Sequence, residues 1–149
     1  MNRTLRAHGL LVRVPEAWDT RLFRRIPDGE EETYPIMHAA SFALPNTRGD
    51  YGSGAVDRMT RDDVMITLLE QEPEAAGTPL FKHQGVPTAH PNDFSTQQLQ
   101  RTLPGQSGCQ YFFSERGRAF VLYVVLGSHA RRATLVPKAN KLIKGLEIR

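Results

Sequence analysis

The histidines and the single cysteine are the residues whose chemistry could hold a metal or drive a reaction. His83, His90 and Asp93 lie on one proline-rich stretch and are side-chain types that bind zinc. Their spacing differs from the i, i+4 histidine pair of zinc peptidases, and no cysteine pair accompanies them. We therefore predict that the chain binds no metal and no cofactor.

Cys109 and His38 are the other candidates for catalysis. A cysteine acts as a nucleophile only when a nearby base or cation lowers its pKa. Cys109 follows Gly108 at the entrance of a strand-like run, where a small buried thiol is the common outcome. His38 lies on an apolar strand face, which favours a hydrogen-bonded core or pocket position. We predict no catalytic residue; the alternative is a small metal- or ligand-binding domain, or an enzyme, that uses residues 83–93 with His38 or Cys109.

A glycine-rich loop at residues 49–54 could cradle a phosphate, because glycines let backbone N–H groups approach an anion. The loop lacks the Lys-Ser/Thr pair of a P-loop, and Asp57 stands where a dinucleotide-binding motif has its third glycine. Asp50 would also repel a phosphate. We interpret the loop as an ordinary turn.

Charge is distributed unevenly along the chain. Residues 28–74 carry eleven acidic and three basic residues, a balance of −8, whereas residues 101–149 carry nine basic and two acidic residues, a balance of +7. Opposed patches can steer a charged partner. The acidic run at 30–32 and a basic pair lie outside the predicted strands. The candidate partner-binding residues are Glu30, Glu31, Glu32, Arg131 and Arg132. We expect the partner to be another protein or a second copy of the chain.

Other partners and locations follow from what the sequence lacks. The basic residues occur without any RNA- or DNA-binding motif, so we expect nucleic-acid binding to be weak, sequence-blind and lost at moderate salt. No run approaches the ~18 apolar residues of a membrane span, and the first residues lack the apolar region of about 7–15 residues found in a secretory signal. One cysteine excludes an internal disulfide and suits a reducing compartment. We expect a cytoplasmic protein; a small-ligand carrier, with the long middle segment as its lid, stays an open alternative.

Strands are the main elements that must position these residues. Apolar patterning predicts strands over residues 8–14, 21–26, 34–44 and 63–71. Residues 110–114 and 119–126 predict a hairpin with Gly117 in its turn, and the second of these strands is apolar on both faces, which is typical of the middle of a sheet. Trp18 is expected in the same buried layer as this strand.

The remaining segments predict helical structure. A helix is expected from about Leu135, with Pro137 in its first turn and Gly145 after its end, followed by a last strand over residues 146–148. Residues 72–106 are rich in proline, and we expect short helical pieces or a winding surface segment.

The two ends of the chain resemble the PsbP-like superfamily. The opening strand leads into Pro15-Glu16-Ala17-Trp18, similar to that family's strand and P-x-x-W, and the closing hairpin, long apolar strand, helix and short strand are also similar. Residues 45–106 depart from the family. The resemblance implies one domain over residues 1–149, of the α+β class: an α/β/α sandwich with a central antiparallel sheet and a C-terminal helix. Because members mostly bind other proteins, it also implies a non-enzymatic interaction or assembly module of unknown pathway.

Overall fold

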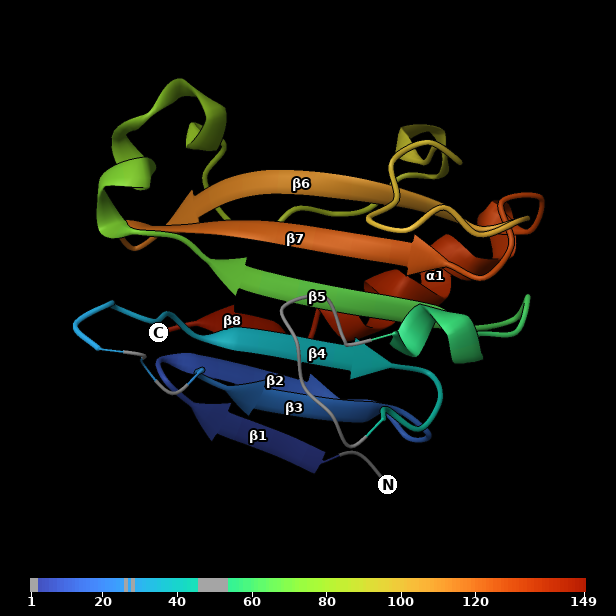
Figure 1. Ribbon diagram of the computed structural model, residues 1–149, viewed down its shortest axis with the longest axis horizontal. Coiled ribbons are helices and arrows are strands. Elements are labelled where there is room, and N and C mark those ends of the chain that lie inside the picture. Colours follow the sequence, from blue (N-terminus) through green and yellow to red (C-terminus); the bar gives the residue numbers. More distant parts are fainter. Residues whose placement is uncertain (1–2, 26, 28, 46–53) are drawn as a thin grey trace.

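The computed structural model describes residues 3–25, 27, 29–45 and 54–149. Within these ranges the chain forms two antiparallel sheets and one α-helix (Figure 1), which places it in the α+β class. The glycine-rich loop interpreted above as a turn lies outside the described residues, apart from Gly54. No helix in the described part is long and apolar enough to cross a membrane.

The smaller sheet has three strands in the order β1-β2-β8, which span Arg3–Ala7, Leu10–Val14 and Leu146–Ile148. β8 lies where the sequence predicts it, and β2 begins two residues after the predicted start because His8 and Gly9 form the preceding turn. β1 was not predicted, because its side chains are mostly exposed and lack an apolar face. It forms because His8 and Gly9 adopt φ values of 55° and 76°, the left-handed pair that a two-residue hairpin turn requires.

The larger sheet has five strands in the order β3-β4-β5-β7-β6. They span Asp19–Phe23, Ile36–Ala40, Val64–Glu70, Arg118–Leu126 and Ser107–Glu115. β7 lies between β5 and β6, as expected for a strand that is apolar on both faces. The predicted strand over residues 21–26 is shifted, because the Asp19 carboxylate accepts a hydrogen bond from the backbone N–H of Leu44 at 2.7 Å and holds the start of β3 beside the chain that leaves β4.

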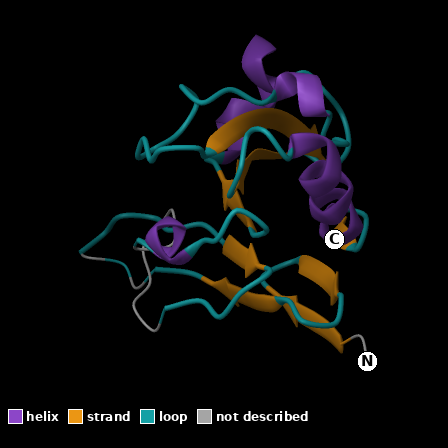
Figure 2. Ribbon diagram, turned by 90° about the vertical axis from the view of Figure 1, so that its right-hand side faces the viewer, coloured by secondary structure: helices purple, strands orange, loops and turns teal. Residues whose placement is uncertain are grey.

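The main core lies between one face of the larger sheet and a cover made of α1 (Arg132–Ile143) and the smaller sheet (Figure 2). Trp18 is 7% exposed and belongs to the same buried cluster as Phe120 and Leu122, which confirms that it shares a layer with β7. The helix begins three residues before the predicted start, at Arg132. Pro137 therefore lies in the second turn, where the prediction of a first-turn position was wrong and the proline removes one helical hydrogen bond.

Short 3₁₀ helices occupy the segment that is rich in prolines, as expected. They are η2 (Pro73–Gly77), η3 (Pro79–Phe81) and η4 (Pro91–Asp93), and η1 (Ala55–Arg58) precedes β5. η1, η2 and η3 pack against the second face of the larger sheet through two small apolar clusters. In η2, η3 and η4 a proline occupies the first helical position, where its missing N–H removes no helical hydrogen bond.

Candidate functional site

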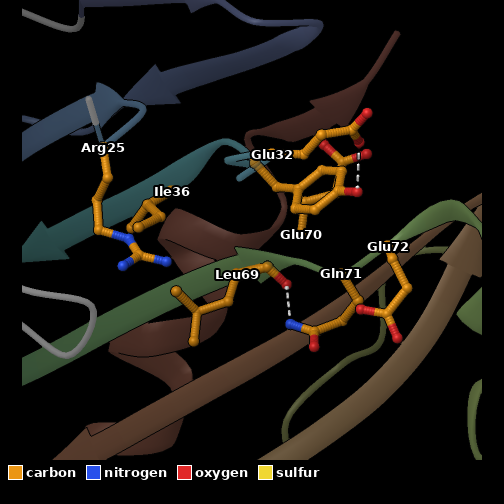
Figure 3. Close-up of a pocket in the computed structure, with 8 residues that line it drawn as sticks. Arg25, Glu32, Ile36, Leu69, Glu70, Gln71 and Glu72 are labelled. Atoms are coloured by element: carbon orange, nitrogen blue, oxygen red, sulfur yellow. Dashed lines mark hydrogen bonds between the residues drawn. The ribbon is translucent and has the colours of Figure 1, made fainter. Parts of the chain in front are cut away.

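An open hollow of about 280 Å³ lies at one end of the strands of the larger sheet, where β5 ends. The antiparallel order brings the end of β3, the start of β4 and the end of β5 to this end. Side chains from β4, from β5 and from the connections beside β3, β4 and β5 line the hollow (Figure 3): Arg25, Glu32, Tyr34, Ile36, Leu69, Glu70, Gln71 and Glu72.

The floor of the hollow is apolar. Ile36 and Leu69 are direct partners across β4 and β5, and Phe23 is the partner of Ile36 across β3 and β4. The three side chains form one buried cluster. A ligand group that enters the hollow therefore meets hydrocarbon beneath it.

The rim of the hollow carries three carboxylates, of Glu32, Glu70 and Glu72, and one cation, that of Arg25. The Tyr34 hydroxyl donates a hydrogen bond to Oε2 of Glu32 at 2.9 Å (Figure 3). This hydrogen bond raises the pKa of Tyr34, and the negative charges of Glu32, Glu74 and Glu72 raise it further. The carboxylates of Glu32, Glu72 and Glu74 thus create a common negative potential at this end of the sheet, which favours a cation.

Glu70 lines the same hollow but is already neutralised. Arg118 binds its carboxylate with two hydrogen bonds of 2.9 and 2.6 Å. The ion pair also raises the pKa of Arg118, so the guanidinium stays charged. A cationic ligand would therefore face Glu32 and Glu72 rather than Glu70.

The structure separates the acidic and basic candidates of the sequence analysis. Glu32 lines the hollow, whereas Glu30 and Glu31 are exposed on the same connection and do not line it. Arg131 and Arg132 stand at the start of α1, near the opposite end of β5. The rise per residue along β5 makes the distance between the two ends of this strand roughly 20 Å. Arg131 pairs with Asp62 at 2.9 Å, and the guanidinium of Arg132 donates to the carbonyl oxygen of His129 at 3.0 Å.

Residues 83–93 serve the fold through their backbone. The His83 carbonyl accepts the N–H of Ser114 at 2.8 Å, and the backbone N–H of His90 donates to the Tyr111 hydroxyl at 3.1 Å. Both histidines are exposed. Across the described ranges, no group of three or more His, Cys, Asp or Glu residues could hold a metal ion.

Cys109 and Tyr111 lie next to this segment, on the face of β6 that meets α1. The Tyr111 hydroxyl donates to Oδ2 of Asp93 at 2.7 Å. Burial, followed by this hydrogen bond, raises the pKa of Tyr111, and burial also raises the pKa of the Cys109 thiol. A thiol that is held protonated is a poor nucleophile, so the arrangement is structural in character.

His38 is buried, as expected, but it lies on the opposite face of the sheet from Cys109. Strand register sets it in a row with Thr67, Tyr123 and Gln110, across four neighbouring strands. The His38 ring meets Phe23 edge-on at 5.1 Å between ring centres. The structure therefore does not bring His38 and Cys109 together, and the sequence alone gave no sign of the polar row because each member sits in a different strand.

The hollow itself was also missed from sequence. Its lining comes from three separated stretches of the chain, and of these residues only Glu32 was a candidate for partner binding. Comparison with protein-family models and with curated protein sequences gives no match. The function must therefore be inferred from the geometry of the site.

Proposed function

We propose that the chain is a non-enzymatic protein-interaction module, and that the hollow at the end of β5 receives a basic side chain of a protein partner. The observation that supports this is an apolar floor of Ile36 and Leu69 beneath a rim that carries Glu32 and Glu72. Lysine and arginine combine a hydrocarbon stem with a charged head. Such a side chain lays its stem on the floor and its cation against the rim.

Charge also determines how the partner arrives. The uneven charge of the chain and the separation of its acidic end from Arg131 and Arg132 support an oriented approach of a basic surface. Rim carboxylates mainly raise the association rate, and salt screens that effect over a Debye length of about 8–10 Å.

The proposal includes membership of the PsbP-like superfamily and its α/β/α sandwich. The helix α1 on one face of the larger sheet and the short helices η1 to η3 on the other support a layered arrangement of that kind. It also includes a cytoplasmic location, which the single buried cysteine supports because no internal disulfide can form.

Affinity purification of the tagged chain from its own host, read by quantitative mass spectrometry, tests the proposed site. Three forms are compared: the wild type, Glu32→Lys/Glu72→Lys in the hollow, and Arg131→Glu/Arg132→Glu at the start of α1. We expect a partner that the wild type enriches to be lost from the hollow variant and retained by the arginine variant.

The controls separate this outcome from simple misfolding. Glu32, Glu72 and Arg131 are exposed and Arg132 is half-buried, so thermal unfolding followed by circular dichroism should match the wild type within a few degrees for the hollow variant and serves as the folding check for the arginine variant. A partner that survives the hollow substitution but is lost with the arginine substitution would place the interface at α1. A partner retained by both variants would exclude both charged surfaces.

A further inference from the structure

β6 forms one outer edge of the larger sheet. The turn at Arg116 and Gly117, with φ values of 53° and 74°, makes Glu115 and Arg118 a hydrogen-bonded pair. Antiparallel strands alternate hydrogen-bonded and non-hydrogen-bonded pairs. The N–H and C=O groups of residues 108, 110, 112 and 114 therefore point away from β7, toward the outside of the sheet.

Both ends of this outer edge are occupied by the chain itself. At one end, the N–H of Ser114 donates to the His83 carbonyl and the N–H of Gly85 donates to the Ser114 carbonyl, each at 2.8 Å. At the other end, Gly108 and Ser95 exchange two backbone hydrogen bonds of 2.9 and 3.0 Å. These contacts show directly that the outward groups of β6 are in position to accept a further strand.

The middle of the edge is open. Among the residues that the structure describes, none forms a backbone–backbone hydrogen bond with Gln110 or Phe112 on the outer side, although the Cys109 thiol donates a long contact of 3.9 Å to the Gln110 carbonyl oxygen. The two crossing segments are residues 83–85, beside Ser114, and Ser95, beside Gly108. Figure 1 shows the outer edge of β6 uncovered between them. Both residues are partly exposed, so their backbone groups can be reached from solvent.

We propose that this gap binds an extended segment of a protein partner, which adds to the sheet as a short strand beside Gln110 and Phe112. The two residues offer two N–H donors and two C=O acceptors, and only another extended backbone matches that alternation. The window between Gly108 and Ser114 admits about five residues, roughly 17 Å of extended chain. The partner strand must then turn away from the sheet at both ends.

A second copy of the chain does not fit the gap through its own β6. If two β6 strands paired with Gln110 opposite Phe112 of the other copy, Ser114 of one would face Gly108 of the other. That place is already taken by Gln84, which bridges Ser114. The crossing segments thus block edge-to-edge self-association, a common device of edge strands, and leave room only for a short peptide.

The surroundings predict one preference in the bound segment. Directly opposite residues of paired strands have their side chains on the same face of the sheet. The side chain of the partner residue opposite Phe112 would therefore lie on the face where the rings of Phe81 and Phe112 are in contact, with 5.7 Å between ring centres. Among the described residues, Leu80, next to Phe81, is a large hydrophobic residue that is 59% exposed to solvent. An apolar or aromatic residue is expected opposite Phe112.

This inference goes beyond the proposed function, because β7 separates β6 from β5, the nearest strand that lines the hollow. The test uses the full chain labelled with ¹⁵N. A random seven-residue phage-display library is panned against it, and the most enriched peptide is synthesised and titrated by NMR. We expect the Gln110 and Phe112 amides to exchange quickly with solvent in the free protein, and to shift and slow at least about tenfold when the peptide binds.

Two matched changes test whether backbone hydrogen bonds hold the peptide. Gln110→Pro removes the outward N–H without touching the ladder to β7, and Gln110→Ala keeps that N–H. We expect the proline variant to bind about tenfold more weakly, which corresponds to one lost hydrogen bond, and the alanine variant to bind as the wild type does. If the proline variant does not fold, the same loss is expected for a peptide N-methylated at the residue that faces Gln110.

Several outcomes would overturn the proposal. These are slow exchange of both amides in the free protein, a library that yields no peptide shifting them, or equal affinity for the normal and the N-methylated peptide. Glu32→Lys/Glu72→Lys should leave the peptide affinity unchanged. Loss of affinity in that variant would instead assign the peptide to the hollow.

Discussion

The guanidinium of Arg118 binds both carboxylate oxygens of Glu70, Nε to Oε2 at 2.9 Å and Nη2 to Oε1 at 2.6 Å. The same group donates to three backbone carbonyl oxygens of the smaller sheet: those of His8, Gly9 and Arg149, at 3.0 to 3.2 Å. Arg118 thus connects β7 and β5 of the larger sheet to the first hairpin and to the end of β8. All five of its N–H groups have a place in this network.

Removing Arg118 should destabilise the protein markedly. Its side chain is 21% exposed and that of Glu70 is 9% exposed, so Arg118→Ala leaves a nearly buried carboxylate without its partner. We expect the free energy of unfolding in urea to fall by about 3 kcal/mol, near the lower end for a buried pair. Arg118→Lys should recover only part of this loss, because an ammonium cannot form the two-pronged contact.

An exposed ion pair of the same chain provides the control for this experiment. Arg13 and Glu147 approach to 3.6 Å with side chains that are 59% and 44% exposed. Arg13→Ala should cost less than about 1 kcal/mol. Equal losses for Arg118→Ala and Arg13→Ala would show that the Arg118 network adds no stability beyond that of a surface pair.

Trp18→Ala should be the most damaging substitution outside the strands. The indole is buried in the main core, and a large-to-small change in a core costs about 3–5 kcal/mol. Chemical unfolding followed by circular dichroism measures this loss. A change below about 1 kcal/mol with unchanged cooperativity would contradict the assignment of Trp18 to the main core.

Asn140 fastens residues 84–95 to the helix. Its side-chain oxygen accepts the backbone N–H of Ala89 at 2.9 Å, and its side-chain nitrogen donates to the Ala89 carbonyl at 3.0 Å. Asn140→Asp removes the donor and sets a negative charge against that carbonyl, at a cost of about 1–3 kcal/mol. Limited proteolysis should then cut residues 84–95 faster, whereas Lys141→Asp on the exposed side of α1 should leave the cleavage rate near that of the wild type.

Alkaline pH should weaken the fold through Cys109. Because burial raises the pKa of the thiol in the folded state, the folded chain keeps a proton that the unfolded chain releases. The corresponding stability is complete below the pKa of an unfolded cysteine, about 8.5, and falls as the pH rises through that value toward the folded pKa. Cys109→Ala should flatten the fall of the free energy of unfolding above pH ~8.5, while Tyr111 contributes in the same direction above pH ~10. An identical pH profile for wild type and Cys109→Ala would contradict this.

Most of the strands could be predicted from the sequence, because the pattern that indicates a strand is local. Alternation of apolar residues marks β2 and β4, an apolar run marks β5, and the two-sided apolar run of residues 119–126 marks β7 as an inner strand. The hairpin of β6 and β7 follows from Gly117, whose positive φ suits a two-residue turn. Burial of Trp18 in the same core as β7 was also predictable, since burying a large aromatic ring that follows a strand removes much apolar surface from water.

Tertiary structure alone decided where the elements lie and which side chains meet. β1 carries no apolar pattern and exists through pairing with β2, and the division into two sheets depends on β8 returning from the far end of the chain. Glu32 and Glu72 share one hollow only because β4 and β5 pair in a particular register. The open edge at Gln110 and Phe112 likewise depends on where residues 85 and 95 cross β6. Such contacts are set by long-range packing free energy, which no local pattern of residues encodes.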